Sequence, residues 1–216
     1  DLAKTFEVGK RLLRPPKAKV RAGQPITLDV ETGETLGIVG ESGCGKSTLA
    51  RMLVGLLEPT GGTIEIEGEP LNTADPAEVG KRIQYVFQDP ISSLNPRKTI
   101  RQIMEAPLRH LHGMDREARA RRISEIFASV NLREEFLDRY PHEFSGGQAQ
   151  RIGIARALAA DARILILDEP VSALDVSVQA AVTDLLMEIQ RNEKTTLLFI
   201  SHDLSIVRYL SDRVMV

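Results

Sequence analysis

The sequence predicts an α/β fold built on a parallel sheet with helices on both faces. Two short, continuous apolar runs, 164–167 and 196–200, the second opened by Thr196, are separated by a helical pattern that extends from Ser177 to Arg191. Fully apolar strands joined by helices are typical of a parallel sheet that is buried on both faces. A third β-favouring run at 35–39 leads through a glycine-rich stretch into an apolar helical pattern at 46–57. This repeated order of strand, loop and helix predicts the centre of the sheet.

Two further segments have β character, and one long region has helical character. The segment from Thr63 to Glu67 alternates as a half-buried strand does, and Ile83 to Phe87 is a β-rich run that stops before Pro90. From about Thr99 to Arg139, apolar residues recur at helical spacing among many charges. This change of pattern predicts a helical lobe inserted into the α/β core.

The length of the chain bounds the number of domains. A single hydrophobic core usually stops growing above roughly 250 residues, and this chain has 216. We therefore expect a single domain over residues 1–216. Within it, we place the core at 1–88 and 161–216 and the helical lobe at 89–160.

The charge and the apolar pattern exclude several classes of protein. The formal net charge is −2, so no excess of positive charge attracts nucleic acid, and we expect no nucleic-acid partner. No apolar run approaches the roughly 20 residues of a membrane-spanning helix, and the first residues lack the order of a signal peptide. The single cysteine, Cys44, excludes a disulfide within this chain and favours a reducing compartment. We expect a cytoplasmic protein whose membrane association comes through another chain.

The glycine-rich stretch that follows the 35–39 run has the spacing of a phosphate-binding loop. It satisfies the pattern G-x-x-x-x-G-K-S/T between a predicted strand and a predicted helix, the context that this pattern requires. Glycines let successive backbone N–H groups face a phosphate, and the following helix adds its positive N-terminal end. The lysine would span the β- and γ-phosphates of ATP, and the serine would bind Mg²⁺. The residues expected to bind ATP here are Gly40, Glu41, Ser42, Gly43, Cys44, Gly45, Lys46, Ser47 and Thr48.

Two acidic residues end the apolar run at 164–167. Asp168 and Glu169 follow it directly, which is the arrangement of a Walker B element. Asp168 would hold the Mg²⁺ shell, while Glu169 would orient or deprotonate the attacking water as a general base. Without a phosphate loop, two acids after a strand could equally cap a helix or face solvent. The loop favours the catalytic interpretation.

A serine followed by two glycines at a predicted helix start narrows the interpretation further. The segment reads Phe144, Ser145, Gly146, Gly147 and Gln148. A small hydroxyl with exposed N–H groups at a helix N-terminus forms an anion site that its own chain need not fill. The segment resembles the signature motif of the ABC (ATP-binding cassette) family, in which this site faces the γ-phosphate held by a second copy of the domain.

Four further matches follow in the order of the ABC family. Gln88 corresponds to the Q-loop, the run from Ser172 to Asp175 to the D-loop, His202 to the switch histidine, and Phe6 to an aromatic residue that stacks on adenine. Each match is weak alone, and Phe6 is equally compatible with a place in the core. Their joint order resembles the family over essentially the whole chain. The resemblance implies catalytic roles for Glu169, His202, Gln88 and Lys46, and Mg²⁺ binding by Ser47, Gln88 and Asp168.

The resemblance also implies a more specific fold. It is that of a P-loop NTPase, with a RecA-like parallel sheet core, an antiparallel β subdomain and an inserted helical lobe. The regions 1–88 and 161–216 would bind ATP and Mg²⁺ and carry the β subdomain, while 89–160 would carry the signature motif. Besides the signature residues, Asp175 is expected to contact the nucleotide.

Finer features resemble the ATPases of dipeptide, oligopeptide and nickel importers. These features are the segments 86–90, 93–97, 140–144 and 173–177. Two positions depart from the family pattern. Phe144 stands where signature motifs commonly begin with leucine, an exchange expected to be harmless, and Ala149 stands where members mostly carry arginine or another polar residue, an exchange expected to loosen a surface contact. Members usually continue well past the position of Val216, so we expect a further carboxy-terminal segment.

The resemblance implies a motor that works as a dimer. Two identical or merely similar cassettes would close head to tail over two ATP molecules, with Ser145, Gly146 and Gly147 of one completing the site of the other. Reopening after hydrolysis would be transmitted through Gln88 and the helical lobe to transmembrane permease subunits. An extracytoplasmic solute-binding protein would act indirectly, by delivering peptide or nickel for uptake. The chain would then be peripheral, at the cytoplasmic face of the cell membrane.

Two alternatives from other classes stay open. A soluble ABC ATPase that acts on DNA or the ribosome would use the same motor without a transporter. DNA-repair relatives insert long coiled coils or zinc modules between the phosphate loop and the signature, where this chain has a compact lobe and a single cysteine. A regulatory sensor would close on ATP without useful hydrolysis, but such sites usually lose the base or the lysine, and Glu169 and Lys46 are both present.

Overall fold

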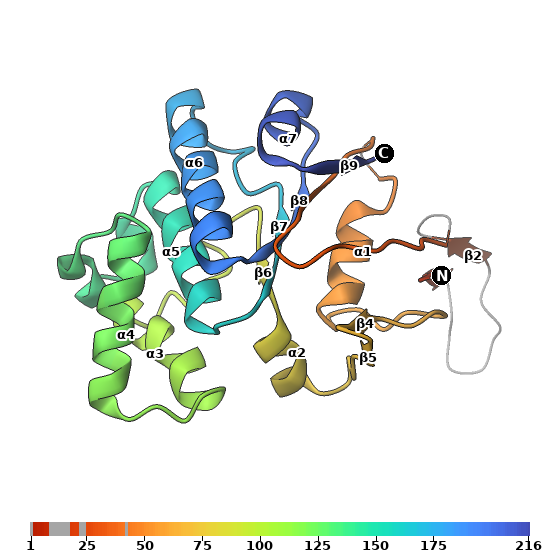
Figure 1. Cartoon of the computed structure of the whole chain (residues 1–216). Helices are drawn as coiled ribbons and strands as arrows, with labels where there is room; N and C mark the ends of the chain where they lie inside the picture. The colour runs from red at the N-terminus through yellow and green to blue at the C-terminus, as the bar shows by residue number, and fades with distance from the viewer. Residues whose placement is uncertain (1, 9–17, 22–24, 42) are drawn as a thin grey trace.

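The centre of the molecule is a five-stranded parallel sheet in the order β6-β7-β8-β3-β9 (Figure 1). The computed structural model describes residues 2–8, 18–21, 25–41 and 43–216. The strands are β3 (Thr35–Ile38), β6 (Ile83–Val86), β7 (Ile164–Asp168), β8 (Thr196–Ile200) and β9 (Arg213–Met215). The predicted α/β fold with a parallel sheet is therefore confirmed, and its neighbouring strands β7, β8 and β3 form from the two apolar runs and the β-favouring run at 35–39.

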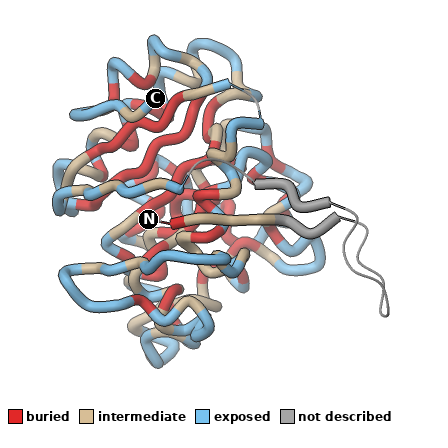
Figure 2. The backbone as a smooth tube through the Cα atoms, turned by 90° about the vertical axis from the view of Figure 1, so that its right-hand side faces the viewer, coloured by how far each residue is buried: buried red, intermediate tan, exposed pale blue. Residues whose placement is uncertain are grey.

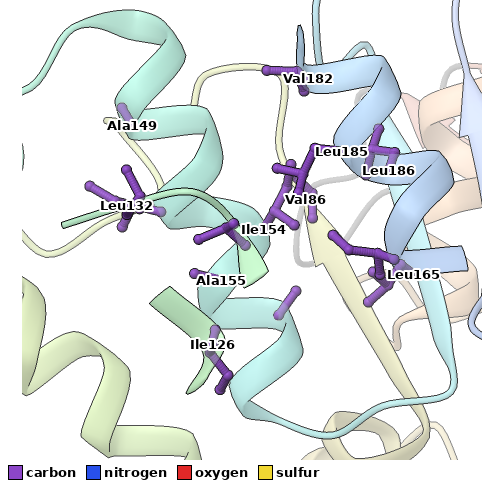
Figure 3. Packing of buried hydrophobic residues seen from close by; sticks show 14 of the residues in the cluster. Val86, Ile126, Leu132, Ala149, Ile154, Ala155, Leu165, Val182, Leu185 and Leu186 are labelled. Carbon is purple, nitrogen blue, oxygen red and sulfur yellow. The ribbon is translucent and has the colours of Figure 1, made fainter. Parts of the chain in front are cut away.

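Alternation along the strands divides their side chains between two cores. In β8, Leu197 and Phe199 belong to the core under α5 (Gly146–Ala159) and α6 (Val176–Glu193), whereas Leu198 and Ile200 belong to the core under α1 (Lys46–Leu53). The tube view shows long buried runs of chain that are bordered by exposed loops (Figure 2). Figure 3 shows the first core, with strand side chains packed against helix side chains. Burying each large apolar side chain contributes about 1.5–3 kcal/mol, so the two cores hold the strand ends in place.

The helical lobe follows β6 and shares its core with one face of the sheet. It contains α3 (Ile100–His110), α4 (Arg116–Ser129), the 3-10 segments η1 (Glu134–Asp138) and η2 (Pro141–Glu143), and the start of α5. Helix α3 begins at a capping box between Thr99 and Gln102, and α4 begins at Asp115, which accepts from the backbone N–H of Ala118. The apolar side chains of the lobe are continuous with those of the sheet. The division of the chain into 1–88, 89–160 and 161–216 stays a prediction.

Antiparallel strand pairs lie on the side of α1 (Figure 1). Strand β1 (Thr5–Val8) pairs with β2 (Ala18–Arg21), and β4 (Glu65–Ile66) pairs with β5 (Glu69–Pro70). An isolated bridge between Ala3 and Gly61 links the first segment to the region of β4. The chain therefore contains an antiparallel β region beside the parallel core.

Two predicted boundaries are wrong. The helix that follows the phosphate loop ends at Leu53 rather than at Leu57, and Gly55 then adopts a φ of +69°. That backbone conformation ends an α-helix and favours glycine. The strand expected over 63–67 is confined to the two residues of β4.

Two helices were not evident in the sequence pattern. They are α2 (Pro76–Arg82) and α7 (Leu204–Leu210), each of seven residues. Their side-chain caps, Asp75 and Asp203, accept from backbone N–H groups of the first turn. Seven residues show too few turns for an apolar period to emerge. Among the described residues, no helix combines the length and the apolar character that crossing a bilayer requires.

Candidate functional site

The predicted catalytic residues gather at one edge of the sheet. The phosphate loop begins after β3, Asp168 is the last residue of β7, and His202 lies two residues after β8. Because these three strands are parallel neighbours, their carboxyl ends lie side by side. Ligands of open α/β sheets bind outside this edge.

The loop between β3 and α1 requires glycine at two positions. Gly43 and Gly45 have φ angles of +84° and +108°, which strain any residue that carries a side chain. Gly45 is also the N-cap of α1, and within the described residues no side chain caps this end of the helix. The first turn of α1 therefore presents N–H donors without intrahelical partners, together with the positive end of the helix dipole. This end of α1 is suited to a phosphate group.

Lys46 bends back over the loop that precedes it. Its Nζ donates to the carbonyl oxygen of Gly40 at 2.7 Å and to that of Glu41 at 2.9 Å. The Sγ of Cys44 lies 3.7 Å from the same nitrogen. These contacts hold a compact positive charge inside the curve of the loop, where a lysine can bridge two phosphates.

Ser47 and Asp168 meet between α1 and β7. The Ser47 hydroxyl donates to Oδ1 of Asp168 at 3.3 Å, and the hydroxyl of Tyr85 on β6 donates to Oδ2 at 2.5 Å. A hydroxyl and a carboxylate are the hard oxygen donors that Mg²⁺ prefers, and Mg²⁺ usually binds through one or two carboxylates together with substrate phosphates. The donor set of Ser47 and Asp168 beside a phosphate loop therefore fits a magnesium ion.

The phenol of Tyr85 is held in its neutral form. Burial raises the pKa of Tyr85 well above its ordinary value, and the hydrogen bond to Asp168 raises it further, while Arg51 on α1 opposes both effects. The hydroxyl therefore remains a hydrogen-bond donor through the neutral and mildly alkaline range. Asp168 keeps a donor on each of its two oxygens.

Glu169 and His202 face each other just beyond β7 and β8. The Nδ1 of His202 lies 2.8 and 2.7 Å from the two carboxylate oxygens of Glu169. Glu169 has a φ of +51°, which is uncommon for a residue with a side chain, and its backbone N–H donates to Ile200 at 2.9 Å. The strained backbone aims the carboxylate away from the strand and toward the histidine. A carboxylate oriented in this way is suited to accept a proton from water.

Gln88 reaches a different partner from the one expected of a metal ligand. It is exposed, and its Nε2 donates to the hydroxyl of Ser172 at 3.4 Å. The same hydroxyl donates to the carbonyl oxygen of Glu169 at 3.1 Å. The structure therefore places Gln88 beside the segment that follows Glu169, and its binding to Mg²⁺ stays a prediction.

The signature segment begins α5, which packs on the opposite face of the sheet from α1. Ser145 is the N-cap of α5, and its hydroxyl accepts from the backbone N–H of Gln148 at 3.4 Å. The side chain of Gln148 accepts in turn from the backbone N–H of Ser145 at 3.1 Å. Ser145 and Gly146 are exposed. The segment thus presents a hydroxyl and a helix N-terminus to the outside of its own chain.

Close packing against the D-loop and α6 accounts for glycine in the signature. A Cβ on Gly146 would lie 3.2 Å from Cδ2 of Leu174, and a Cβ on Gly147 would lie 2.5 Å from Cγ1 of Val178. Asp175, the N-cap of α6, is exposed and its side chain forms no cap hydrogen bond. The signature and the D-loop therefore form one surface in this chain.

Two predicted contacts lie outside the described part of the chain. Ser42 is not among the described residues, and Phe6 belongs to β1 but its side chain is not described. The stacking role of Phe6 stays a prediction. Thr48 is half-buried in the first turn of α1, behind Ser47.

Comparison with known proteins decides the family. The family model described as "ABC transporter" matches residues 24–172. The chain belongs to the ABC transporter family. The resemblance carried by the phosphate loop, the acidic pair and the signature is thereby confirmed.

Curated members of the ABC transporter family match the whole chain. It is 49% identical over 222 residues to the oligopeptide transport ATP-binding protein OppF of Escherichia coli (strain K12), a match that covers 100% of this chain and 66% of that protein. It is 48% identical over 219 residues to the dipeptide transport ATP-binding protein DppF of the same organism, covering 100% of this chain and 65% of that protein. The chain therefore spans slightly less than two thirds of these relatives, and its resemblance to the peptide-transport subfamily is confirmed.

Solved ABC cassettes have the same fold. The dimeric, post-hydrolysis structure of the ATP-binding cassette MJ0796 bound to ADP and Pi matches with a TM-score of 0.85 and 31% identity, covering 99% of this chain and 90% of that one. The structure of cbiO1 from Clostridium perfringens, part of the ABC transporter complex cbiONQ, matches with a TM-score of 0.80 and 27% identity, covering 99% and 82%. The P-loop fold with its parallel core, antiparallel strands and inserted helices is thus confirmed.

The two departures from the ABC pattern have different outcomes. The ring of Phe144 is buried and packs edge-to-face on Phe136, with centroids 5.5 Å apart, so the core accommodates the larger side chain. The expected surface role of position 149 is wrong, because Ala149 is 0% exposed. Helix α5 turns this residue into the core, with Ile152 one turn later.

One polar residue that the structure places against Asp168, Tyr85, was not predicted from the sequence. Its signal is the alternation of β6, which places Tyr85 and Ile83 on the face that also carries Ile166 of β7. Tyr85 could therefore have been identified as a hydroxyl residue on the same face as Asp168, one strand away from it.

Proposed function

We propose that this chain is the ATP-binding and ATP-hydrolysing cassette of an ABC importer that takes up peptides. The observation that carries the proposal is the convergence of three groups at one sheet edge: the phosphate loop with Lys46, the Ser47–Asp168 pair, and the Glu169–His202 pair. Phosphoryl transfer depends mainly on positioning and charge stabilisation, and this set supplies both. The names of the relatives OppF and DppF support peptides as the solute; nickel is a second solute class, supported by the sequence motifs alone.

Each group has a defined task on bound ATP. The N–H groups of the first turn of α1 bind the β-phosphate, and Lys46 neutralises charge on the β- and γ-phosphates. Glu169 orients the attacking water and accepts its proton, while His202 holds the carboxylate in place. A magnesium ion held by Ser47 and Asp168 would neutralise charge on the phosphate oxygens. Together these residues form the half of the site that one chain provides.

The second half of the site comes from another cassette. Ser145, Gly146 and Gly147 lie at the start of α5, on the opposite face of the sheet from α1, and present a helix N-terminus, which suits the γ-phosphate held by a partner. Asp175 and the D-loop, packed beside the signature, would meet the same partner. Closure over two ATP molecules then requires a head-to-tail dimer of identical or similar cassettes. The dimeric structures of the MJ0796 cassette support association of two such domains.

The helical lobe would couple this cycle to transport. Gln88 and the lobe at 89–160 would connect the catalytic edge to transmembrane permease subunits. Loss of the γ-phosphate reopens the dimer as a rigid-body change, and the permease would follow it. The cassette would then be peripheral at the cytoplasmic face of the membrane, and a solute-binding protein on the other side would deliver the peptide. Nucleic acid has no part in this cycle.

Replacing the proposed base tests the catalytic assignment. In the full-length protein, Glu169→Gln should lower phosphate release by at least about 100-fold, because a general base contributes that much. ATP should still bind, and ATP-bound dimers should accumulate in size-exclusion chromatography with light scattering. Glu188→Gln, the same change at an exposed position of α6, should leave turnover unchanged. Normal turnover in Glu169→Gln would remove Glu169 from this role.

Removing the histidine tests its part in holding Glu169. His202→Ala should lower kcat about tenfold and change ATP affinity less than twofold, since it removes orientation of the base and no phosphate contact. His110→Ala, an exposed histidine of α3, is the matched control. Equal losses in kcat and in affinity would show that His202 is structural.

A further inference from the structure

The phenol of Tyr85 reaches the acidic end of the neighbouring strand. β6 and β7 are parallel, with Tyr85 opposite Ile166. Because side chains alternate along a strand, Asp168 lies on the same face as Ile166, two residues farther toward the carboxyl edge. The long tyrosine side chain spans this offset, so that its Oη lies 2.5 Å from Oδ2 of Asp168.

Packing holds the phenol in this direction. Tyr85 and Asp168 are each 7% exposed. The tyrosine ring packs edge-to-face against Phe87, with centroids 4.5 Å apart and an interplanar angle of 64°. Ile83 and Ile166 belong to the same apolar cluster as Tyr85. The hydroxyl is therefore delivered to the carboxylate by a ring with little freedom to turn.

The two oxygens of Asp168 consequently have different surroundings. Oδ2 is occupied by the buried phenol, while Oδ1 is the oxygen that Ser47 contacts at 3.3 Å, on the side of α1 and the phosphate loop. Hydrogen bonds to an ionised carboxylate are strong, and partners of this kind orient the carboxylates that bind metals. We infer that Tyr85 is a positioning residue, which anchors Oδ2 of Asp168 so that Oδ1 faces the magnesium site shared with Ser47. The inference rests on the proposed function, because Mg²⁺-ATP binding gives Asp168 its task.

The competing interpretation is that Tyr85 only fills the core. A packing role requires the ring and not the hydroxyl, so Tyr85→Phe separates the two. The readout is Mn²⁺ binding in the presence of ADP, measured from the free Mn²⁺ signal in electron paramagnetic resonance, which does not depend on turnover. Tyr85→Phe should raise the Kd for Mn²⁺ roughly tenfold, the usual effect of losing a partner of a metal ligand, while ADP binding in EDTA changes less than twofold.

A matched control makes the same chemical change away from the site. Tyr209 is 61% exposed on α7, and its hydroxyl donates to Oδ1 of Asp184 at 3.1 Å. Tyr209→Phe should leave both the Mn²⁺ and the ADP affinities unchanged. Thermal unfolding of each variant establishes that the compared proteins are folded at the assay temperature.

A double-mutant cycle tests whether Tyr85 acts through Asp168. If it does, Tyr85→Phe should add no further loss of Mn²⁺ affinity in an Asp168→Asn background, because the shared partner is already altered. Additive losses would overturn the inference. So would an unchanged Mn²⁺ affinity in folded Tyr85→Phe, or an equal loss of metal-free ADP binding. Failure of the wild-type protein to bind ADP in a metal-dependent way would instead overturn the proposed function itself.

Discussion

The phosphate side and the signature side of the site are built in different ways. On the phosphate side, polar groups pair with one another inside the chain, as Asp168 does with Ser47 and Tyr85. On the signature side, the described hydrogen bonds of the Ser145 side chain are those of its own capping box, and this residue is exposed. The first arrangement is complete once the chain folds. The signature side leaves its donors facing outward, which is expected of a surface that completes the site of another molecule.

The largest effect expected on the signature side comes from adding charge to it. Ser145→Asp keeps an N-cap side chain for α5, so stability should hardly change. The carboxylate would repel the terminal phosphate of a partner's ATP and remove a stabilising donor, which should lower turnover about 100-fold. Nucleotide affinity of the single chain, measured by equilibrium dialysis, should stay within twofold of wild type.

The control for this variant separates the cap from the charge. Ser145→Asn also caps α5 but carries no charge, so it should lose less activity than Ser145→Asp. A large loss of nucleotide affinity in dilute, monomeric Ser145→Asp would contradict the distinction between the two sides, since it would place Ser145 at its own chain's nucleotide.

A smaller effect tests the close packing behind the signature. The Cβ of Gly147→Ala would lie 2.5 Å from Val178 Cγ1, and overpacking of this kind costs about 1–3 kcal/mol of unfolding free energy. Gly80→Ala, in helix α2, is the matched control, because its Cβ would lie 3.6 Å or more from its neighbours. There the better helix propensity of alanine should stabilise the protein by up to about 1 kcal/mol. Urea denaturation of both variants should therefore give shifts of opposite sign.

Rescue identifies the cause of the destabilisation. Adding Val178→Ala to Gly147→Ala removes the methyl group that the new Cβ would meet, so stability should partly return. A Gly147→Ala protein as stable as Gly80→Ala would show that α6 does not lie as close to the signature as described.

The smallest effect concerns an ion pair on the lobe, away from both halves of the site. The Arg101 guanidinium donates to the two oxygens of Asp138 at 2.9 and 3.2 Å, and this hydrogen bonding holds the pKa of Asp138 below its ordinary value. A lowered pKa in the folded state means that the pair stabilises the protein above the unfolded-state pKa and ceases to do so as the pH falls through the folded-state pKa. Asp138→Asn should lower the melting temperature at pH 7 by no more than about 2 °C, because the pair is exposed.

The pH dependence provides the check on this last prediction. Differential scanning calorimetry at acid pH, below the folded-state pKa of Asp138, should show no difference between Asp138→Asn and wild type. A difference in melting temperature between the two proteins that grows as the pH falls would contradict a stabilising role for this ion pair. ATP turnover should be unchanged at pH 7.

The sequence predicts the fold best where a strand is buried on both faces of the sheet, because such a strand consists almost entirely of apolar residues. The apolar runs at 164–167 and 196–200 form β7 and β8 with almost no change of boundary. The short helices α2 and α7 were not predicted from the sequence. Each has only seven residues, and its capping residue, Asp75 or Asp203, marks it more clearly than an apolar period does.

The site was predictable where chemistry demands fixed spacing along the chain. Lys46 follows from the spacing of the phosphate loop between β3 and α1, and Asp168 and Glu169 follow from their place at the carboxyl end of an apolar strand. Tyr85 did not follow, because its partner lies 83 residues farther along the chain and only strand pairing brings them together. The burial of Ala149 was likewise set by how α5 rotates against the core, which no local pattern shows.

Mixing two inactive variants tests the central claim, that each site is shared between two cassettes, most directly. Lys46→Ala removes the phosphate side and keeps the signature, while Ser145→Asp does the opposite. In a head-to-tail heterodimer of the two, one site has both defects and the other has none. Mixing equal amounts should therefore restore ATP hydrolysis, to about a quarter of the wild-type rate if subunits exchange at random and sites act independently. If each chain built its whole site alone, the mixture would be no more active than its components, and that result, obtained with dimers shown to have exchanged, would contradict the account.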